Sequence, residues 1–315
     1  MRLVADVGGT KTLLGVAHAG ELHSVMRFDN DTAPTFLALV ENYLDGLPAA
    51  QRAALDAACF ALAAPITGDV VRLTNRAHWR IERGQISALL DGAVVHLVND
   101  FAAAAAGLTA LDDDDLVTLQ SSTQPQSGVR LCLGPGTGFG VAALYADTVL
   151  VSEGGHIGFA PVDAQQMDLW RFLGGEHRRV TVERLCSGPG LLAIYRYCLI
   201  RSGHPLPPDL TAAEVVRRAR EAEDIEAKQA LTLLVRILGA VAGDLALTFL
   251  AHGGVYLAGG IAPKLLPELT GETFLQAFND KAEHAALVRT IPVRVVLRED
   301  LPLLGAARYA AAPGK

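Results

Sequence analysis

LVADVGGTKTLLGV, which spans residues 3–16, places a short apolar run on each side of a Gly-Gly turn. Both runs have the length and composition of buried strands, so the pattern predicts a β-hairpin. Glycine at the turn lets backbone N–H groups approach a ligand, because no Cβ stands in the way. The turn in DVGGTKT (6–12) is therefore a candidate phosphate cradle, although a Gly-Gly turn taken alone is more often a plain hairpin.

The residues around this first turn suit nucleotide phosphates and a hard cation. Gly8 and Gly9 supply accessible amides, and Thr10 has a hydroxyl that can donate a hydrogen bond. Lys11 brings positive charge, and Asp6 is placed to hold Mg²⁺ through a water molecule. Asp6, Gly8, Gly9, Thr10 and Lys11 are therefore candidate nucleotide-binding residues.

A second strand, glycine turn and strand follows at residues 129–145, so the two halves of the chain share one plan. Its turn, GPGTGFG (134–140), has four glycines in seven residues. Glycine loses more conformational entropy on folding than other residues, so this number of glycines indicates that a ligand must approach the backbone closely. A third turn, AGGI (258–261), lacks side chains that would keep a flat base off the backbone. None of them matches a P-loop or a dinucleotide-binding glycine motif.

Strand and helix signals alternate along the chain, which predicts an α/β fold. A short strand at 96–98 ends at Asn99 and Asp100, and an alanine-rich helix follows. An amide next to a carboxylate can orient a hydroxyl and accept its proton. An equally good interpretation is that the pair caps the helix.

A further group of polar residues surrounds the Gly-Gly pair at 154–155. Glu153 and His156 flank that pair, and Glu183 follows later in the chain. Carboxylates and imidazoles accept hydrogen bonds from sugar hydroxyls. Taken singly, each is better interpreted as a surface glutamate or a structural histidine.

Length and composition limit the possible functions. At 315 residues the chain exceeds a typical single domain, which predicts two lobes. The net charge of −7 and the lack of a basic cluster argue against nucleic-acid binding. The apolar segment 231–250 contains Arg236 and Asp244, so we expect a buried helix and no membrane span. Four separated cysteines and the absence of a signal-peptide pattern predict a cytoplasmic protein without zinc or disulfides.

The order of these motifs resembles the bacterial glucokinase family of the hexokinase, heat-shock-ATPase and actin superfamily. The resemblance covers nearly the whole chain through the segments DVGGTKT, ALAAPITGD (61–69), LTN with Trp79, HLVNDFAA (96–103), GPGTGFG, SEGGHIGFAP (152–161), VERLCSGPGL (182–191), LAGGI (257–261) and LPLLGAA (301–307). It implies a two-lobed actin-like ATPase fold, which is ribonuclease H-like, with an active-site cleft between the lobes. We expect residues 1–108 and 298–315 in the small lobe, and 109–297 in the large one.

The resemblance also implies an activity and a role for each site residue. The activity is transfer of the γ-phosphoryl group of ATP to the 6-hydroxyl of glucose, with Mg²⁺ held mainly by ATP. Asp100 is implied as the catalytic base. The implied sugar ligands are Asn99, Asp100, Glu153, His156 and Glu183. The implied nucleotide contacts are Gly8, Gly9, Thr10, Gly136, Thr137, Gly138, Gly259 and Gly260.

Some observations separate this chain from relatives or leave alternatives open. Lys11 stands where many family members have Asn, and Gly158 stands where an acidic residue is common. Residues 157–182 contain no cysteine, whereas the sister family of repressors and sugar kinases has a cysteine-rich zinc motif in this region.

Three alternative functions remain: a kinase for another hexose, a kinase that uses polyphosphate as donor, and a sugar-sensing protein without catalysis. A homodimer and a role in glycolysis are implied by the resemblance alone.

Overall fold

The computed structural model describes the chain except residues 74–75, 123–126, 209, 222–223 and 312–315. The chain folds into two compact units, which we describe separately. Unit 1 comprises Met1–Asp113, Asp147–Val151 and Arg298–Lys315, and unit 2 comprises Asp114–Ala146 and Ser152–Leu297. Unit 1 thus takes in the segment Asp147–Val151, which the sequence prediction assigned to the large lobe.

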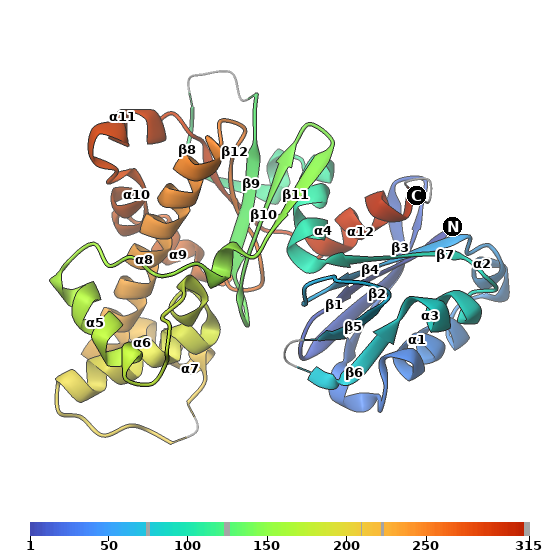
Figure 1. Cartoon of the computed structure of the whole chain (residues 1–315), viewed down its shortest axis with the longest axis horizontal. Helices are drawn as coiled ribbons and strands as arrows, with labels where there is room; N and C mark the ends of the chain where they lie inside the picture. The colour runs from blue at the N-terminus through green and yellow to red at the C-terminus, as the bar shows by residue number, and fades with distance from the viewer. Residues whose placement is uncertain (74–75, 123–126, 209, 222–223, 312–315) are drawn as a thin grey trace. The chain divides into compact units, whose positions relative to one another are not determined.

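Unit 1 is built on a five-stranded sheet with the order β3-β2-β1-β4-β7 (Figure 1). Its strands are β1 (Arg2–Val7), β2 (Lys11–His18), β3 (Glu21–Asp29), β4 (Ala57–Leu62) and β7 (Val94–Asn99). β1 is antiparallel to β2 and parallel to β4, and β4 is parallel to β7. A separate hairpin consists of β5 (Val70–Leu73) and β6 (Arg76–Glu82). The helices are α1 (Phe36–Asp45), α2 (Ala49–Ala53), α3 (Arg83–Leu89), α4 (Asp100–Gly107) and α12 (Leu301–Ala311).

A six-stranded sheet with the order β11-β10-β9-β12-β13-β8 repeats this plan. Unit 2 supplies β8 (Leu116–Gln120), β9 (Arg130–Pro135), β10 (Phe139–Tyr145), β12 (Gly254–Leu257) and β13 (Val293–Val296), whereas the edge strand β11 (Thr148–Ser152) consists almost entirely of the Asp147–Val151 segment of unit 1. β9 pairs antiparallel with β10 and parallel with β12, as β1 does with β2 and β4. β8 is an added antiparallel edge strand. The shared plan predicted for the two halves is confirmed.

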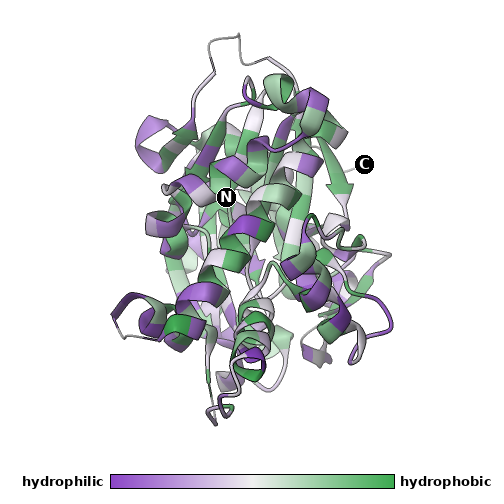
Figure 2. Cartoon of the chain, turned by 90° about the vertical axis from the view of Figure 1, so that its left-hand side faces the viewer, coloured by the Kyte–Doolittle hydropathy of each residue, from purple (hydrophilic) through white to green (hydrophobic). Residues whose placement is uncertain are grey.

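The core of unit 2 lies between this sheet and its helices. The helices are α5 (Ala164–Gly174), α6 (Gly188–Arg201), α7 (Ala212–Glu221), α8 (Ile225–Phe249), α9 (Leu266–Leu269), α10 (Glu272–Asn279) and α11 (Ala285–Val288). Figure 2 shows hydrophobic and hydrophilic segments alternating along helices of this unit, as expected for helices with one buried side. α8 is long and apolar enough to cross a membrane, but 78% of its most apolar window is buried in the protein. It is the core helix that the sequence predicted.

Strands β3 and β8 are among those that the sequence analysis did not predict. β3 has an almost entirely exposed burial pattern, so it lacks the apolar alternation that identifies a strand. β8 ends at the polar residue Gln120, next to the polar stretch 120–128, which is not typical of a strand. The Gln120 side-chain amide donates hydrogen bonds to the carbonyl oxygens of Val288 and Ile291 at 3.1 and 2.8 Å. Partners distant in sequence therefore stabilise this edge of the sheet.

Helices α4 and α12 pack backbone against backbone in unit 1. A Cβ at Gly305 of α12 would overlap the carbonyl oxygen of Ala103 in α4. A Cβ at Gly107 would lie 2.5 Å from the carbonyl oxygen of Leu301. Small residues at both positions let the helices approach closely, and this contact fixes the helix that begins at Asp100.

We predict that Gly305→Ala lowers the free energy of unfolding by about 2 kcal/mol, because the new methyl group must displace the Ala103 carbonyl group. Gly174→Ala is the matched control, since a Cβ at this helix position would meet nothing within 4 Å. Urea unfolding followed by circular dichroism measures both. If the two variants are equally stable, α4 and α12 can move apart without a loss of stability, and the prediction is wrong.

Candidate active site

The first glycine turn, which joins β1 to β2, is held from behind by one buried asparagine. The Asn30 side chain is fully buried and donates to the Gly8 carbonyl oxygen at 2.9 Å. It accepts from the Thr12 hydroxyl at 2.7 Å, and its backbone N–H donates to the Thr10 carbonyl oxygen at 2.9 Å. Two of the turn's carbonyl groups are therefore bound on the protein side.

Arg76 holds the same turn from β6. Its Nε donates to the Gly9 carbonyl oxygen at 3.1 Å, and a terminal nitrogen donates to the Asn30 carbonyl oxygen at 3.3 Å. The guanidinium also pairs with Asp31 and lies over the Trp79 ring at 4.9 Å. In the part of the chain that the structure describes, the amides of Gly9 and Thr10 have no acceptor. These two N–H groups are therefore available to an anion.

Asp6 and Asp100 lie at the carboxyl ends of parallel strands in the same sheet. Asp6 pairs with Ala61 of β4, and Leu62 of β4 pairs with Asn99, the residue before Asp100. Burial raises the pKa of Asp6 to about 7, and the negative charge of Asp100 adds to this rise while Arg27 opposes it. The two carboxylates are therefore close enough to influence each other's charge.

The structure around Asn99 and Asp100 is compatible with both interpretations of the pair, as a helix cap and as groups that orient a hydroxyl and accept its proton. Asn99 is the N-cap of α4, and its side-chain oxygen accepts from the N–H groups of Phe101 and Ala102 at 3.0 and 3.1 Å. Its amide nitrogen points to the Ala64 carbonyl oxygen at 3.4 Å. Asp100 occupies the first turn of α4, where the helix dipole favours a carboxylate. The cap fixes the backbone from which Asp100 projects.

The other two glycine turns lie side by side in unit 2. The Ala258 N–H donates to the Leu133 carbonyl oxygen at 2.8 Å, and the Ile261 N–H donates to that of Pro135 at 3.2 Å. A Cβ at Gly134 would overlap the Ala258 carbonyl group, so glycine is required for this contact. Gly259 has a φ of 85°, which also favours glycine. Tertiary pairing therefore joins two turns that are far apart in sequence.

The predicted sugar-binding residues of unit 2 project from two backbone segments that pair with each other. The Phe159 N–H donates to the Val180 carbonyl oxygen, and the Val182 N–H to that of Ile157, both at 3.0 Å. Glu153 and His156 are about half exposed, with a carboxylate oxygen 3.8 Å from the imidazole Nε2. The turn between them packs on β10, where a Cβ at Gly155 would overlap the Phe139 carbonyl oxygen. This pairing joins the Glu183 segment to the Glu153–His156 turn.

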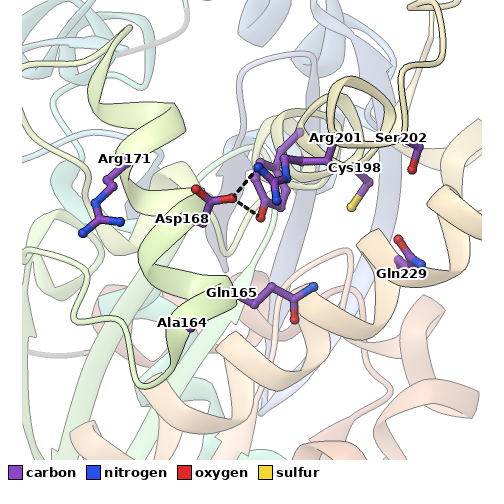
Figure 3. A pocket seen from close by; sticks show the side chains of 9 residues that line it. Ala164, Gln165, Asp168, Arg171, Cys198, Arg201, Ser202 and Gln229 are labelled. Carbon is purple, nitrogen blue, oxygen red and sulfur yellow. Dashed lines mark hydrogen bonds and ion pairs between the residues drawn. The ribbon is translucent and has the colours of Figure 1, made fainter.

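A separate open groove of about 600 Å³ lies in unit 2 between α5, α6 and α8. In Figure 3, Asp168 contacts Arg201 at 3.4 Å and accepts from the Tyr197 hydroxyl at 3.0 Å. The groove lining includes none of the predicted site residues. We therefore place the candidate site at the glycine turns and not in this groove.

Comparison with known proteins identifies the family. The chain matches the Glucokinase family model over residues 3–313. The chain belongs to the glucokinase family. It is 37% identical to a glucokinase of Agrobacterium fabrum, with 99% of this chain and 92% of the relative covered. It is 35% identical to a glucokinase of Nostoc sp., with 98% of each chain covered.

A solved structure of a glucokinase from an Antarctic psychrotroph superposes with a TM-score of 0.83. It is 31% identical to this chain and covers 98% of both chains. The two-lobed actin-like ATPase fold that the resemblance implied is therefore confirmed, as is the family.

The glucokinase site residues predicted from sequence divide between the two units. Unit 1 carries Asp6, Gly8, Gly9, Thr10, Lys11, Asn99 and Asp100. Unit 2 carries Gly136, Thr137, Gly138, Glu153, His156, Glu183, Gly259 and Gly260. Thr74 and Asn75 of the LTN segment lie outside the described residues. The individual roles of these residues stay predictions.

Asn30 and Arg76 were missed by the sequence reasoning, although they hold the first turn. Neither belongs to a glycine motif, and each is distant in sequence from the turn that it contacts. Arg76 directly follows the LTN segment and precedes Trp79. These two features, which carry the family resemblance, are the only sequence signals near Arg76.

We predict that Asn30→Ala lowers the free energy of unfolding by about 2 to 3 kcal/mol, because the buried Thr12 hydroxyl and the Gly8 carbonyl group lose their partner. Asn42→Ala, at an exposed position of α1, is the control and should change stability little. Thermal unfolding compares the two. If Asn30→Ala has the same melting temperature as the wild type, the buried asparagine does not hold the turn.

We predict that Asp6→Asn stabilises the protein at pH 8 by about 2 kcal/mol and hardly at all near pH 4. The pKa of Asp6 is raised from 3.8 to about 7, so in this range the unfolded chain releases a proton that the folded chain keeps. Wild-type stability therefore falls as the pH rises from about 4 to about 7. Asparagine, which does not ionise, removes this loss.

Melting temperatures of wild type and Asp6→Asn between pH 4 and pH 8 test this prediction. Asp91→Asn, at an exposed aspartate of the same unit, serves as control and should show no such gain. A gain that does not depend on pH would exclude ionisation of Asp6 as its cause.

Proposed function

We propose that this chain is an ATP-dependent glucokinase, which transfers the γ-phosphoryl group of ATP to the 6-hydroxyl of glucose. The observation that carries this proposal is an aspartate, Asp100, at the start of a helix in a chain of the glucokinase family. The relatives named above are glucokinases, and nearly their whole length is covered.

Asp100 acts as the general base in this proposal. A primary hydroxyl is a poor nucleophile at neutral pH, and an ionised carboxylate at hydrogen-bond distance can take its proton. The α4 dipole favours the ionised form, and the Asn99 cap holds the first turn of the helix in place. As the hydroxyl oxygen bonds to the γ-phosphorus, its proton moves to Asp100 and the bond from that phosphorus to ADP breaks.

The glycine turns bind the nucleotide in this proposal. The free amides of Gly9 and Thr10 donate to phosphate oxygens, with Lys11 nearby in sequence. The paired turns of unit 2 bind phosphates at Gly136–Gly138 and the adenosine at Gly259 and Gly260. Glu153, His156 and Glu183 accept hydrogen bonds from glucose hydroxyls.

Mg²⁺ belongs to this proposal as the partner of ATP. In this proposal ATP phosphates supply most of the Mg²⁺ ligands. Asp6 fits a cation held through water, because its raised pKa shows that its charge lacks compensation. When bound, Mg²⁺ neutralises charge on the transferring phosphates.

Location and assembly are further proposals. Family membership alone supports a homodimer that works in the cytoplasm and supplies glycolysis with glucose 6-phosphate.

The test of the activity is a coupled assay of ADP formation by the purified protein. We expect glucose with ATP and Mg²⁺ to give the highest kcat/KM among glucose, mannose, fructose and N-acetylglucosamine. Faster turnover of another sugar, or with polyphosphate, would reassign the substrate or the donor. Sugar binding without turnover would instead indicate a sensor.

We predict that Asp100→Asn lowers kcat by about 10²- to 10⁴-fold, because asparagine keeps the shape but cannot accept the proton. Glucose affinity, measured by calorimetry, should fall less than kcat. The fold should persist, since Asn99 still caps α4. Asp91→Asn is the control, and turnover of Asp100→Asn within threefold of that control would exclude Asp100 as the base.

A further inference from the structure

Glu183, which the proposed function makes a glucose ligand, also contacts the backbone of the second glycine turn. Its Oε2 accepts a hydrogen bond from the Phe139 N–H at 2.9 Å. Phe139 is the last residue but one of GPGTGFG and the first residue of β10. Within the described part of the chain, no hydrogen bond to Oε1 is found, and the side chain is half-buried. One carboxylate oxygen thus binds the turn, and the other remains for a ligand.

Gly138 shows how closely this carboxylate lies against the turn. A Cβ at Gly138 would overlap Oε2 of Glu183. Gly138 is not among the residues with positive φ, so its backbone conformation does not call for glycine. A side chain at this position would displace the Glu183 carboxylate from its place beside the turn. Glycine at position 138 thus leaves room for the Glu183 contact.

The backbone around Glu183 is joined to the other end of the same turn. The Ser187 hydroxyl, which is 2% exposed, donates to the Glu183 carbonyl oxygen at 2.7 Å and accepts from the Gly190 N–H at 3.0 Å. The Gly188 N–H donates to the Gly136 carbonyl oxygen at 2.9 Å. Both Glu183 and Gly136 are thereby attached to the start of α6, so the side-chain contact closes a ring of hydrogen bonds.

We propose that Glu183 is a positioning residue for the phosphate-binding turn, and that through it hexose binding and nucleotide binding are coupled. This inference rests on the proposed function. A sugar hydroxyl that donates to Oε1 restrains the carboxylate whose Oε2 holds the Phe139 N–H. Restraint of the turn before the nucleotide arrives lowers the entropy lost on binding. The coupling is reciprocal, so nucleotide binding strengthens hexose binding by the same factor.

Variants of Glu183 separate this role from sugar binding. Glu183→Gln keeps an oxygen that can accept from the Phe139 N–H, whereas Glu183→Ala removes the acceptor. We expect Glu183→Ala to weaken ADP binding in the absence of any sugar by about tenfold, and Glu183→Gln to stay within about threefold of wild type. Glu283→Ala is the matched control, because this exposed glutamate of unit 2 lies outside the proposed site and should change sugar-free ADP affinity less than twofold.

The measurements are ADP affinity by calorimetry with Mg²⁺ and no sugar, and exchange of the Phe139 amide hydrogen. Amide exchange should accelerate about tenfold or more in Glu183→Ala and remain slow in Glu183→Gln, since a broken hydrogen bond exposes the amide. This readout does not depend on glucokinase activity. Melting temperatures of all variants exclude general unfolding as the cause.

If Glu183→Ala keeps the ADP affinity and the Phe139 amide exchange rate of the wild type, the inference is overturned and Glu183 is only a sugar ligand. Equal loss of ADP affinity in Glu183→Ala and Glu183→Gln with unchanged exchange would also overturn it, because charge and not position would then be responsible. Failure of the wild type to bind ADP or to phosphorylate glucose would count against the proposed function. The exchange comparison would still decide the contact between Glu183 and Phe139.

Discussion

Direct contact of one backbone with another at glycine positions is the constraint on which this structure depends. Gly134 lies against Ala258, Gly155 against Phe139, and Gly305 against Ala103, and a single Cβ at any of them would overlap a carbonyl group. These contacts unite the two turns of unit 2, seat the Glu153–His156 turn on β10, and fix α4. Because the methyl group of alanine already overlaps, the sequence has little freedom there. The site residues are consequently carried by backbone that is held at short range.

Carbonyl groups of the first two glycine turns are bound on the protein side. Asn30 and Arg76 bind the carbonyl oxygens of the first turn, and the Gly188 N–H binds that of Gly136 in the second. In the first turn this arrangement leaves the Gly9 and Thr10 amides without an acceptor among the described residues, and such amides are suited to an anion. It also explains a cost in stability, since Asp6 stands beside Asp100 with a raised pKa.

The duplicated sheets explain why the site residues come from separate parts of the chain. In each unit the glycine turn joins the central strand to its antiparallel neighbour, at the end where the parallel strands also finish. Polar residues at that edge, such as Asp6 and Asn99, do not interrupt the apolar interior of the sheet. Unit 2 adds β8 and more helices to the same plan, and it carries the predicted sugar-binding turn. One architecture thus supplies the two glycine turns that are predicted to bind phosphates.

The sequence by itself determined the class of fold, the three glycine turns and the family, because strand periodicity and glycine spacing are local properties and the motifs occur in a fixed order. Tertiary structure decided what holds the turns. Asn30 and Arg76 reach the first turn from other elements, and Glu183 reaches Phe139 across 44 positions of sequence, so no local pattern reveals them. The strands β3 and β8 escaped prediction for the same reason, since one is exposed and the other relies on distant partners. Hydrogen bonds between distant residues, such as those of Asn30, Arg76 and Glu183, exist only after the chain has folded.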